Sequence, residues 1–311
     1  MNPYAKLRLA LPRLLTLDRQ LEDVKINQGR ILAELGRDKA TTSLSDHEFK
    51  VFSQWGEDGI LQHLTRHVHI ENKTFIEFGV EDFFESNCRF LMMKDMWQGF
   101  VIDGSEKNLD RMRSSYFYWR YQLQGRCAFI TRDNVAALLD ESGFDKEVGI
   151  LSVDVDGVDW FLLNALEAWR AAIVIVEYNG MFGGKHPVTV PYDASFYRTR
   201  AHHSNIYYGA SLMAFDSLLR SRGYALVGVN GMGSNAFFVR RDLLQSAIRE
   251  VSVENSFRPT WFREGRDASG QLTFRSASSL GRDIAELPLV NTLSGASMRL
   301  GDVLEAPVST S

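Results

Sequence analysis

Acidic side chains follow two neighbouring apolar runs in the middle of the chain. Asp154 and Asp156 follow the first run, and the segment Glu177-Tyr178-Asn179 ends the second. Residues two apart on a continuing strand project to the same side, so Asp154 and Asp156 should face the same way. Carboxylates among apolar residues are costly unless a metal ion or a proton compensates for their charge. Two uses stay open: the group binds a hard cation such as Mg²⁺, or it binds ammonium and hydroxyl groups of ligands directly. The predicted metal ligands are Asp154, Asp156, Glu177 and Asn179.

Small and polar residues follow the apolar runs that come earlier in the chain. Gly79 lets the backbone approach a ligand closely, and Ser86 or Asn87 can cap the next helix and meet a carboxylate there. Asp103 follows the second run, where a carboxylate can accept hydrogen bonds from both hydroxyls of a ribose. The segment has a single glycine, so the GxGxxG fingerprint of dinucleotide-binding folds is missing. These residues predict a nucleoside-containing cofactor other than a nicotinamide dinucleotide.

Asp133 and Asn134 follow the third run. They either bind an adenine amino group or cap the next helix. The predicted cofactor-binding residues are Glu77, Gly79, Ser86, Asn87, Asp103, Ser105, Asp133, Asn134 and Asp154.

The segment between the fifth and sixth runs contains the candidates for a general base. His202 and His203 precede a predicted helix that begins near Gly209, and histidine is the natural base near neutral pH. Each of them can equally be an ordinary surface histidine. The predicted catalytic residues are Asp154, His202 and His203.

Short apolar runs alternate with amphipathic stretches from residue 50 onward, which predicts parallel strands joined by helices. Only residues 230–235 separate the last two runs, too few for a crossover helix, so these two runs should form an antiparallel hairpin. Five βα units with a terminal hairpin are the layout of the class I methyltransferase fold, a doubly wound, Rossmann-like α/β sheet of seven strands. The predicted strands are 74–80, 99–104, 128–131, 149–155, 171–178, 224–229 and 236–240.

The first forty residues predict a helical arm. Apolar residues alternate at spacings of three and four, the pattern of a coiled-coil seam; Pro12 lies just before the pattern and Gly36 just after it. Either this stripe packs on the catalytic domain, or it joins two copies of the chain into a homo-oligomer. The stripe consists of Leu14, Leu17, Leu21, Val24, Gln28, Ile31 and Leu35.

We therefore expect three regions. Residues 1–44 form the arm, 45–249 the catalytic domain and 250–311 a C-terminal extension. In the extension, arginines are interleaved with aromatic residues. It either covers part of the site or forms an interface, or it is an irregular packing tail.

The composition is that of an ordinary globular protein: of the 311 residues 45% are hydrophobic and 24% are charged, with a net charge of −4. No basic run suggests a nucleic-acid partner. Cys88 and Cys127 lack any CxxC partner and are expected to be reduced thiols. No apolar stretch approaches the length of about 20 residues that spans a bilayer, and the N-terminus does not resemble a signal peptide. A cytoplasmic location is the expectation.

Several of these segments together resemble the FkbM-like methyltransferases. The resemblance covers roughly residues 50–242, and its strength comes from the order and spacing of the motifs. They are Phe52-Ser53-Gln54-Trp55-Gly56-Glu57-Asp58-Gly59, Phe75-Ile76-Glu77-Phe78-Gly79, Glu85-Ser86-Asn87, Val101-Ile102-Asp103-Gly104, Asp154-Val155-Asp156-Gly157, Val176-Glu177-Tyr178-Asn179, Val190-Pro191-Tyr192-Asp193 and Tyr207-Tyr208-Gly209-Ala210-Ser211-Leu212.

The resemblance implies transfer of a methyl group from S-adenosylmethionine to a hydroxyl oxygen, often of a sugar in a polysaccharide or a glycosylated natural product. Some related sugar O-methyltransferases use Mg²⁺ and a histidine base, but this chain has Glu-Tyr-Asn in place of an adjacent acidic pair. The acceptor is then a small molecule or glycan. The alternative from another class is a noncatalytic scaffold or assembly protein that retains the fold, with the helical arm as its functional part.

Overall fold

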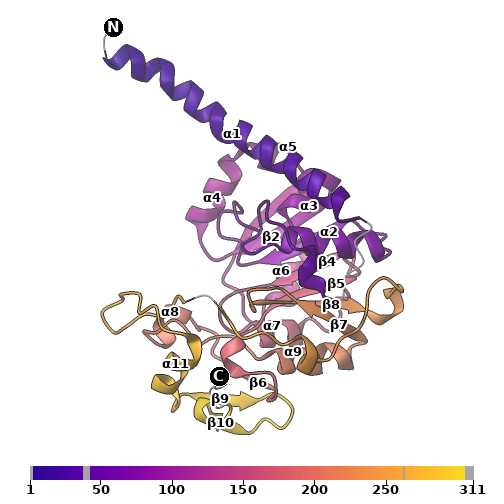
Figure 1. Ribbon diagram of the computed structural model, residues 1–311, viewed down its shortest axis with the longest axis vertical. Helices are drawn as coiled ribbons and strands as arrows, with labels where there is room; N and C mark the ends of the chain where they lie inside the picture. The colour runs from indigo at the N-terminus through magenta and orange to yellow at the C-terminus, as the bar shows by residue number, and fades with distance from the viewer. Residues whose placement is uncertain (1–2, 38–42, 262, 305–311) are drawn as a thin grey trace.

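The computed structural model describes residues 3–37, 43–261 and 263–304. Its centre is a sheet of seven strands in the order β3-β2-β1-β4-β5-β8-β7 (Figure 1). The strands are β1 (Thr74–Phe78), β2 (Gln98–Asp103), β3 (Leu123–Cys127), β4 (Ile150–Val153), β5 (Ile173–Glu177), β7 (Tyr224–Val229) and β8 (Asn235–Arg240).

The first five strands are parallel, and β8 runs antiparallel to both β5 and β7. Because helices cover both faces, β1, β4 and β5 are apolar on both sides and bury nearly all their residues. This order with its terminal hairpin is the class I methyltransferase fold, and the prediction of that fold is confirmed.

Two apolar cores lie on opposite faces of the sheet. The helices α2, α3, α4 and α5 contribute side chains to one core, and α6, α7 and α9 contribute to the other. The main helices are α1 (Pro3–Leu35), α2 (Glu57–His67), α3 (Arg89–Asp95), α4 (Glu106–Ser114), α5 (Tyr116–Arg120), α6 (Val135–Asp140), α7 (Asp159–Ala165) and α9 (Leu212–Ser221).

The third strand lies five residues earlier than the sequence predicted. Residues 128–131, the apolar run taken for a strand, follow β3 instead of forming it. The strand β3 is at the edge of the sheet and alternates between buried and more exposed residues. An edge strand with one solvated side needs no continuous apolar run, which explains the error.

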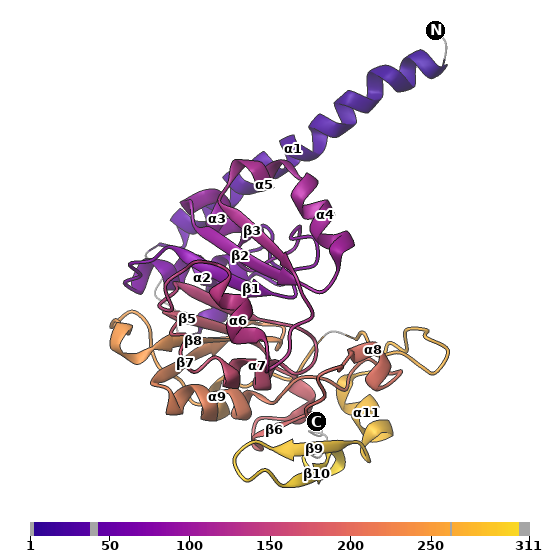
Figure 2. The same ribbon diagram turned by 180° about the vertical axis from the view of Figure 1, so that it is seen from behind.

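The N-terminal helix α1 is longer than predicted, because it begins at Pro3 and contains Pro12. Its C-terminal half docks on the domain through Ile26 and Ala33, while Gly29 lies so close to the domain that a Cβ there would be 2.5 Å from Val51 Cγ2. The half that contains the N-terminus projects away from the body (Figure 2).

The heptad stripe is on the opposite side of α1. Its described apolar side chains are exposed, from 47% for Leu17 to 76% for Leu35, while the Leu14 side chain is outside the described residues. The interpretation that this stripe packs on the catalytic domain is therefore wrong, because the face with Ile26 and Ala33 does so.

A second, small sheet has the order β10-β9-β6 and lies at the end of the molecule opposite α1 (Figure 1). It joins β6 (Val188–Thr189), from the segment after β5, with β9 (Pro288–Asn291) and β10 (Ser297–Arg299). The short helices α8 (Arg198–Ala201), α10 (Val253–Ser256) and α11 (Ala277–Gly281) belong to the same two regions of the chain. Residues 180–209 and much of the C-terminal extension thus form one lobe with its own apolar core.

Within the described residues, no helix combines the length and the apolar character needed to cross a membrane. Cys88 and Cys127 are both free thiols, as expected.

Candidate functional site

Two adjoining cavities open at the carboxyl ends of the parallel strands, where doubly wound sheets bind their ligands. The β2-side cavity has a volume of about 380 Å³ and is lined by residues that follow β1, β2, β3 and β4. The β5-side cavity has a volume of about 720 Å³ and is lined by residues from the tips of β1, β4, β5 and β8. Five residues line both cavities: Gly79, Glu81, Asp154, Asp156 and Arg198.

Gly79 makes the close approach between the first and fourth strand tips possible. Its φ is +66°, and a Cβ at this position would be 1.9 Å from the carbonyl oxygen of Asp154. No other residue type fits, because both the backbone conformation and the space exclude a side chain. Gly79 therefore forms the floor where the two cavities meet.

Asp103 lies in the β2-side cavity with its carboxylate held by backbone groups. One oxygen accepts the N–H of Glu81 and the other accepts the N–H of Ser105, each at 2.8 Å. The oxygen that accepts the Ser105 N–H, Oδ1, also accepts the side-chain amide of Asn108 at 3.4 Å. Because a carboxylate oxygen has two lone pairs, Oδ2 is the oxygen that keeps one for a ligand hydroxyl. Ser105 lines the same cavity and caps α4 by accepting the N–H of Asn108.

Glu77, Ser86 and Asn87 line the β5-side cavity but also brace each other. The Glu77 carboxylate accepts the Ser86 hydroxyl at 2.7 Å and the Asn87 N–H at 2.8 Å. Burial raises the pKa of Glu77, and these hydrogen bonds oppose that effect. The Asn87 amide in turn donates to the Ser152 hydroxyl. Most of the hydrogen bonds that these three side chains make thus hold the loop after β1 in place.

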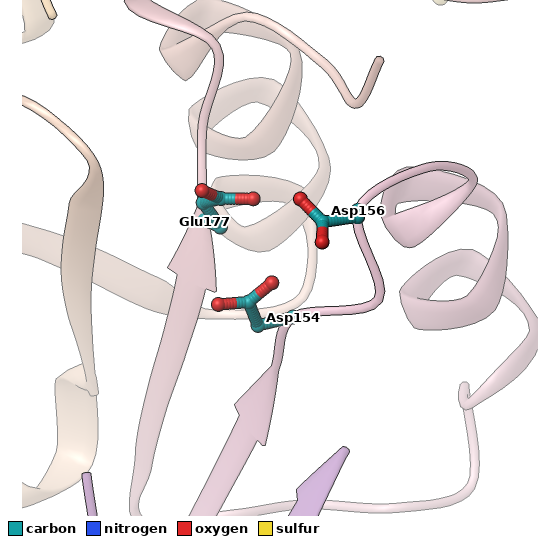
Figure 3. Close-up of side chains that lie close together, drawn as sticks. All are labelled: Asp154, Asp156 and Glu177. Atoms are coloured by element: carbon teal, nitrogen blue, oxygen red, sulfur yellow. The ribbon is translucent and has the colours of Figure 1, made fainter. Parts of the chain in front are cut away.

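Three of the four predicted ligands lie close together, but their local structure differs from the expectation. Oxygens of Asp154, Asp156 and Glu177 lie within 4.8 Å of one another (Figure 3). The strand β4 ends at Val153, and Asp156 turns toward its neighbours in a left-handed conformation with φ +56°. Asp159 fixes this turn by accepting the N–H groups of residues 155 and 157. The two aspartates therefore meet through a loop and not along a strand.

Two of these acids favour the protonated form. Burial and then the neighbouring carboxylates raise the pKa of Asp154 and of Glu177 well above the ordinary range of carboxylic acids. Two charges at this separation in a poorly solvated place repel each other, so a proton or a cation between them lowers their free energy.

Asn179 lines neither of the two cavities, and its amide is engaged elsewhere. Its amide nitrogen donates to the carbonyl oxygens of Ile206 and Tyr208, and its side-chain oxygen accepts the Met181 N–H. This amide is consumed in holding the segment after β5.

Arg198 is a site residue that the sequence did not reveal. Its guanidinium lies 3.9 Å from the ring centroid of Tyr208 and bridges Asp156 to Glu264 of the C-terminal extension. The extension thus closes over one side of the cleft, and Arg263 and Glu264 line the β5-side cavity. No motif signals such a contact between segments 66 residues apart.

His202 and His203 are near Arg198 in the chain but line neither cavity. The two rings contact each other at 4.1 Å, and the His202 ring is hydrogen-bonded to Ser204. The carboxylates of the cluster do line the cavities, whereas a role of either histidine as the base stays a prediction. In this loop it is Arg198 whose side chain lines the cavities, and not the two histidines that follow it.

Asp133 and Asn134 are also outside the linings of both cavities. The Asn134 side chain accepts the Thr131 N–H and donates to the Phe129 carbonyl oxygen, which is a local turn. Because β3 ends at Cys127, the residues after it that reach the β2-side cavity are Ala128, Phe129 and Ile130.

The motif before β1 forms a wall of the β5-side cavity. Asp58 accepts the backbone N–H groups of residues 51, 52 and 53 at 2.7 to 2.8 Å, and burial raises its pKa to about 6. Glu57 is fully buried and accepts the side-chain amides of Asn230 and Asn235. Both acids were visible in the motif, but their partners on β8 and the hairpin were not.

No protein-family model and no curated protein sequence matches this chain, so membership of the FkbM-like family stays a prediction. Solved structures do resemble its fold. The CurJ carbon methyltransferase is 9% identical with a TM-score of 0.37, over 59% of this chain and 52% of the other. The N-terminal domain of EvdMO1 with SAH bound is 12% identical with a TM-score of 0.34, over 53% and 72%.

An O-methyltransferase family protein from Burkholderia thailandensis is 7% identical with a TM-score of 0.36, over 70% of this chain and 57% of the other. This chain thus spans about half the length of the CurJ structure and somewhat more of the other two. At such identities and TM-scores, the likeness concerns the arrangement of strands and helices and does not extend to the chemistry.

Proposed function

We propose that this protein transfers a methyl group from S-adenosylmethionine to a hydroxyl oxygen, with a sugar as the acceptor. The observation that carries the proposal is the junction of the two cavities at Gly79 and Asp154. A carboxylate suited to ribose lies on one side of this junction, and a pair of acids suited to proton transfer lies on the other.

The β2-side cavity suits the adenosine part of the donor. Asp103 offers an oriented carboxylate for the ribose hydroxyls, and Ile102, Phe129 and Ile130 offer apolar surface for the adenine ring. Its volume lies in the range of ordinary ligand pockets. Gly79 lets the rest of the donor pass closely over the strand tip toward the β5-side cavity.

The charge of the shared wall also suits this donor. Glu81, Asp154 and Asp156 contribute carboxylates there, and Arg198 is the one cation among the five shared residues. S-adenosylmethionine supplies a methyl group on a positively charged sulfur, which an acidic wall attracts.

When Asp154 and Glu177 share one proton, the member of the pair that stays ionised can take the proton of the acceptor hydroxyl. As the oxygen–carbon bond forms and the carbon–sulfur bond breaks, the hydroxyl proton passes to a carboxylate. A base works best when its pKa lies near the working pH, and burial shifts both acids in that direction. Arg198 limits the excess negative charge by pairing with Asp156.

The donor set of the cluster also fits a hard divalent cation such as Mg²⁺, because three carboxylates converge within 4.8 Å. Asp154, Asp156 and Glu177 would hold it. Such an ion would polarise a bound hydroxyl and lower its pKa.

The experiment that tests the proposal is calorimetric titration with S-adenosylmethionine, and with NAD as the matched control. We expect binding of the first and none of the second. A protein that binds neither is better explained as a scaffold. A screen of nucleotide sugars and oligosaccharides, with release of S-adenosylhomocysteine as the signal, then identifies the acceptor; turnover only on non-hydroxyl acceptors would contradict O-methylation.

A further inference from the structure

Two buried oxygen atoms near the acidic cluster have no hydrogen-bond partner among the described residues. They are Oε2 of Glu177 and Oδ1 of Asn235. Asn235 is only 5% exposed, and both residues line the β5-side cavity. A buried oxygen without a donor is unfavourable, so two of them on neighbouring strands indicate a missing partner.

The strand register places the two side chains next to each other. Glu177 is the last residue of β5, Asn235 is the first of β8, and the two are directly opposed in the antiparallel pair. Opposed residues of an antiparallel pair project to the same face, with Cβ atoms about 5 Å apart. Asn235 therefore stands beside the cluster of Asp154, Asp156 and Glu177.

The orientation of the Asn235 amide is fixed by its other end. Its Nδ2 donates to Oε1 of Glu57 at 2.9 Å, and the same oxygen accepts the amide of Asn230 at 2.7 Å. A reversed amide would bring Oδ1 against the carboxylate of Glu57, with repulsion in place of a hydrogen bond. Glu57 thus acts as a positioning residue that leaves Oδ1 free for a ligand.

We propose that Asn235 completes a site for one divalent hard cation, together with Asp154, Asp156 and Glu177. Three carboxylates and one neutral amide oxygen are a donor set that Mg²⁺ and Mn²⁺ prefer. Arg198 engages Oδ1 of Asp156, which leaves Oδ2 for the ion. The two orphaned atoms are inaccessible to water, whereas a bare ion is smaller than a water molecule.

The test is titration of the metal-free protein with Mn²⁺ alone, followed by calorimetry and by the signal of free Mn²⁺ in electron paramagnetic resonance. We expect one site in the wild type and an affinity lower by roughly tenfold or more in Asn235→Ala. Glu85→Gln is the matched control, because Glu85 lines the same cavity but is exposed and pairs with Lys50. It should keep the wild-type affinity.

A second variant covers the case in which Asn235→Ala fails to fold. Glu177→Gln keeps the shape of the side chain and brings an amide that can donate to Oδ1 of Asn235. We expect it to lose Mn²⁺ binding while its thermal stability without metal stays at or above that of the wild type. Equal Mn²⁺ affinity of wild type and Asn235→Ala, or no binding by the wild type at millimolar Mn²⁺, would overturn the proposal.

The outcome is separable from that of the proposed function. Binding of S-adenosylmethionine without any Mn²⁺ site rejects the cation site alone. A Mn²⁺ site without binding of S-adenosylmethionine rejects the methyl donor and leaves the cation site standing.

Discussion

At the scale of single residues, Asp103 is the residue of the β2-side cavity that we propose to bind the ribose of the donor. Under the proposed ribose contact, replacing Asp103 with Ala removes the carboxylate that accepts from the ribose, so the dissociation constant of S-adenosylmethionine should rise by about 100-fold or more. Calorimetric titration measures it. Asp103→Asn keeps one acceptor and should fall between wild type and Asp103→Ala. An unchanged dissociation constant in Asp103→Ala would refute the ribose assignment.

This variant needs a check of its fold, because Asp103 also accepts the backbone N–H groups of residues 81 and 105. Thermal unfolding of both variants provides it. Weaker binding counts as evidence for the ribose contact only where the folded fraction matches that of the wild type.

The sequence could predict which residue types gather at the strand tips, but it could not show which of them are already satisfied. Asn179 and Asn235 both adjoin the fifth strand, and both carry an amide. The amide of Asn179 is consumed by its own loop, while that of Asn235 keeps a free oxygen. The difference arises from contacts with Ile206 and with Glu57, which are distant in the chain.

At the scale of elements, the exposed stripe of α1 predicts association of the chain with a second copy through a coiled coil. We expect the wild type to be an oligomer, and the double variant Leu21→Glu with Val24→Glu to have the mass of a smaller species in light scattering. Lys25→Glu, exposed on the same helix but outside the stripe, is the control. Equal masses for wild type and double variant would contradict the coiled coil.

Deletion of residues 1–36 would be a poorer test of the same idea. Glu22 of α1 accepts a hydrogen bond at 2.8 Å from Arg89, whose side chain is only 1% exposed. Without α1, a buried guanidinium would lose its carboxylate partner, which destabilises proteins strongly. A change in mass after deletion would then mix lost association with lost stability.

The elements that were predicted well from the sequence are strands that are buried on both faces of the sheet, because such strands appear as continuous apolar runs. The strands β1, β4 and β5 and the terminal hairpin follow from apolar runs and a short connection. The edge strand β3, the start of α1 and the small sheet of β6, β9 and β10 were missed. Edge strands carry a weak signal, and the small sheet joins segments about 100 residues apart, which no local pattern shows.

At the scale of the whole molecule, folding keeps one histidine neutral and thereby makes stability depend on pH. His63 stacks on His47 at 3.6 Å, and burial together with neighbouring cations lowers its pKa to about 3. The unfolded chain takes up this proton at the ordinary histidine pKa of about 6.5. Stability from this group is therefore present above about pH 6.5 and is lost as the pH falls toward 3.

We expect thermal unfolding measurements on His63→Gln to show a smaller drop in midpoint than the wild type between about pH 7 and pH 4. His69→Gln, at an exposed histidine of the same region, should follow the wild type. Parallel curves for wild type and His63→Gln would show that this histidine does not contribute to the acid sensitivity of the fold.

Five residues line both cavities, so binding in one cavity should affect binding in the other. Gly79 allows the tips of β1 and β4 to lie in contact, so a shift of Asp154 toward the proposed ion would also shift the wall around the proposed nucleoside. Thermodynamics then demands reciprocity: whatever factor one occupant adds to the affinity of the other, it receives in return. The dissociation constant measured for either cavity should therefore depend on whether the other cavity is occupied.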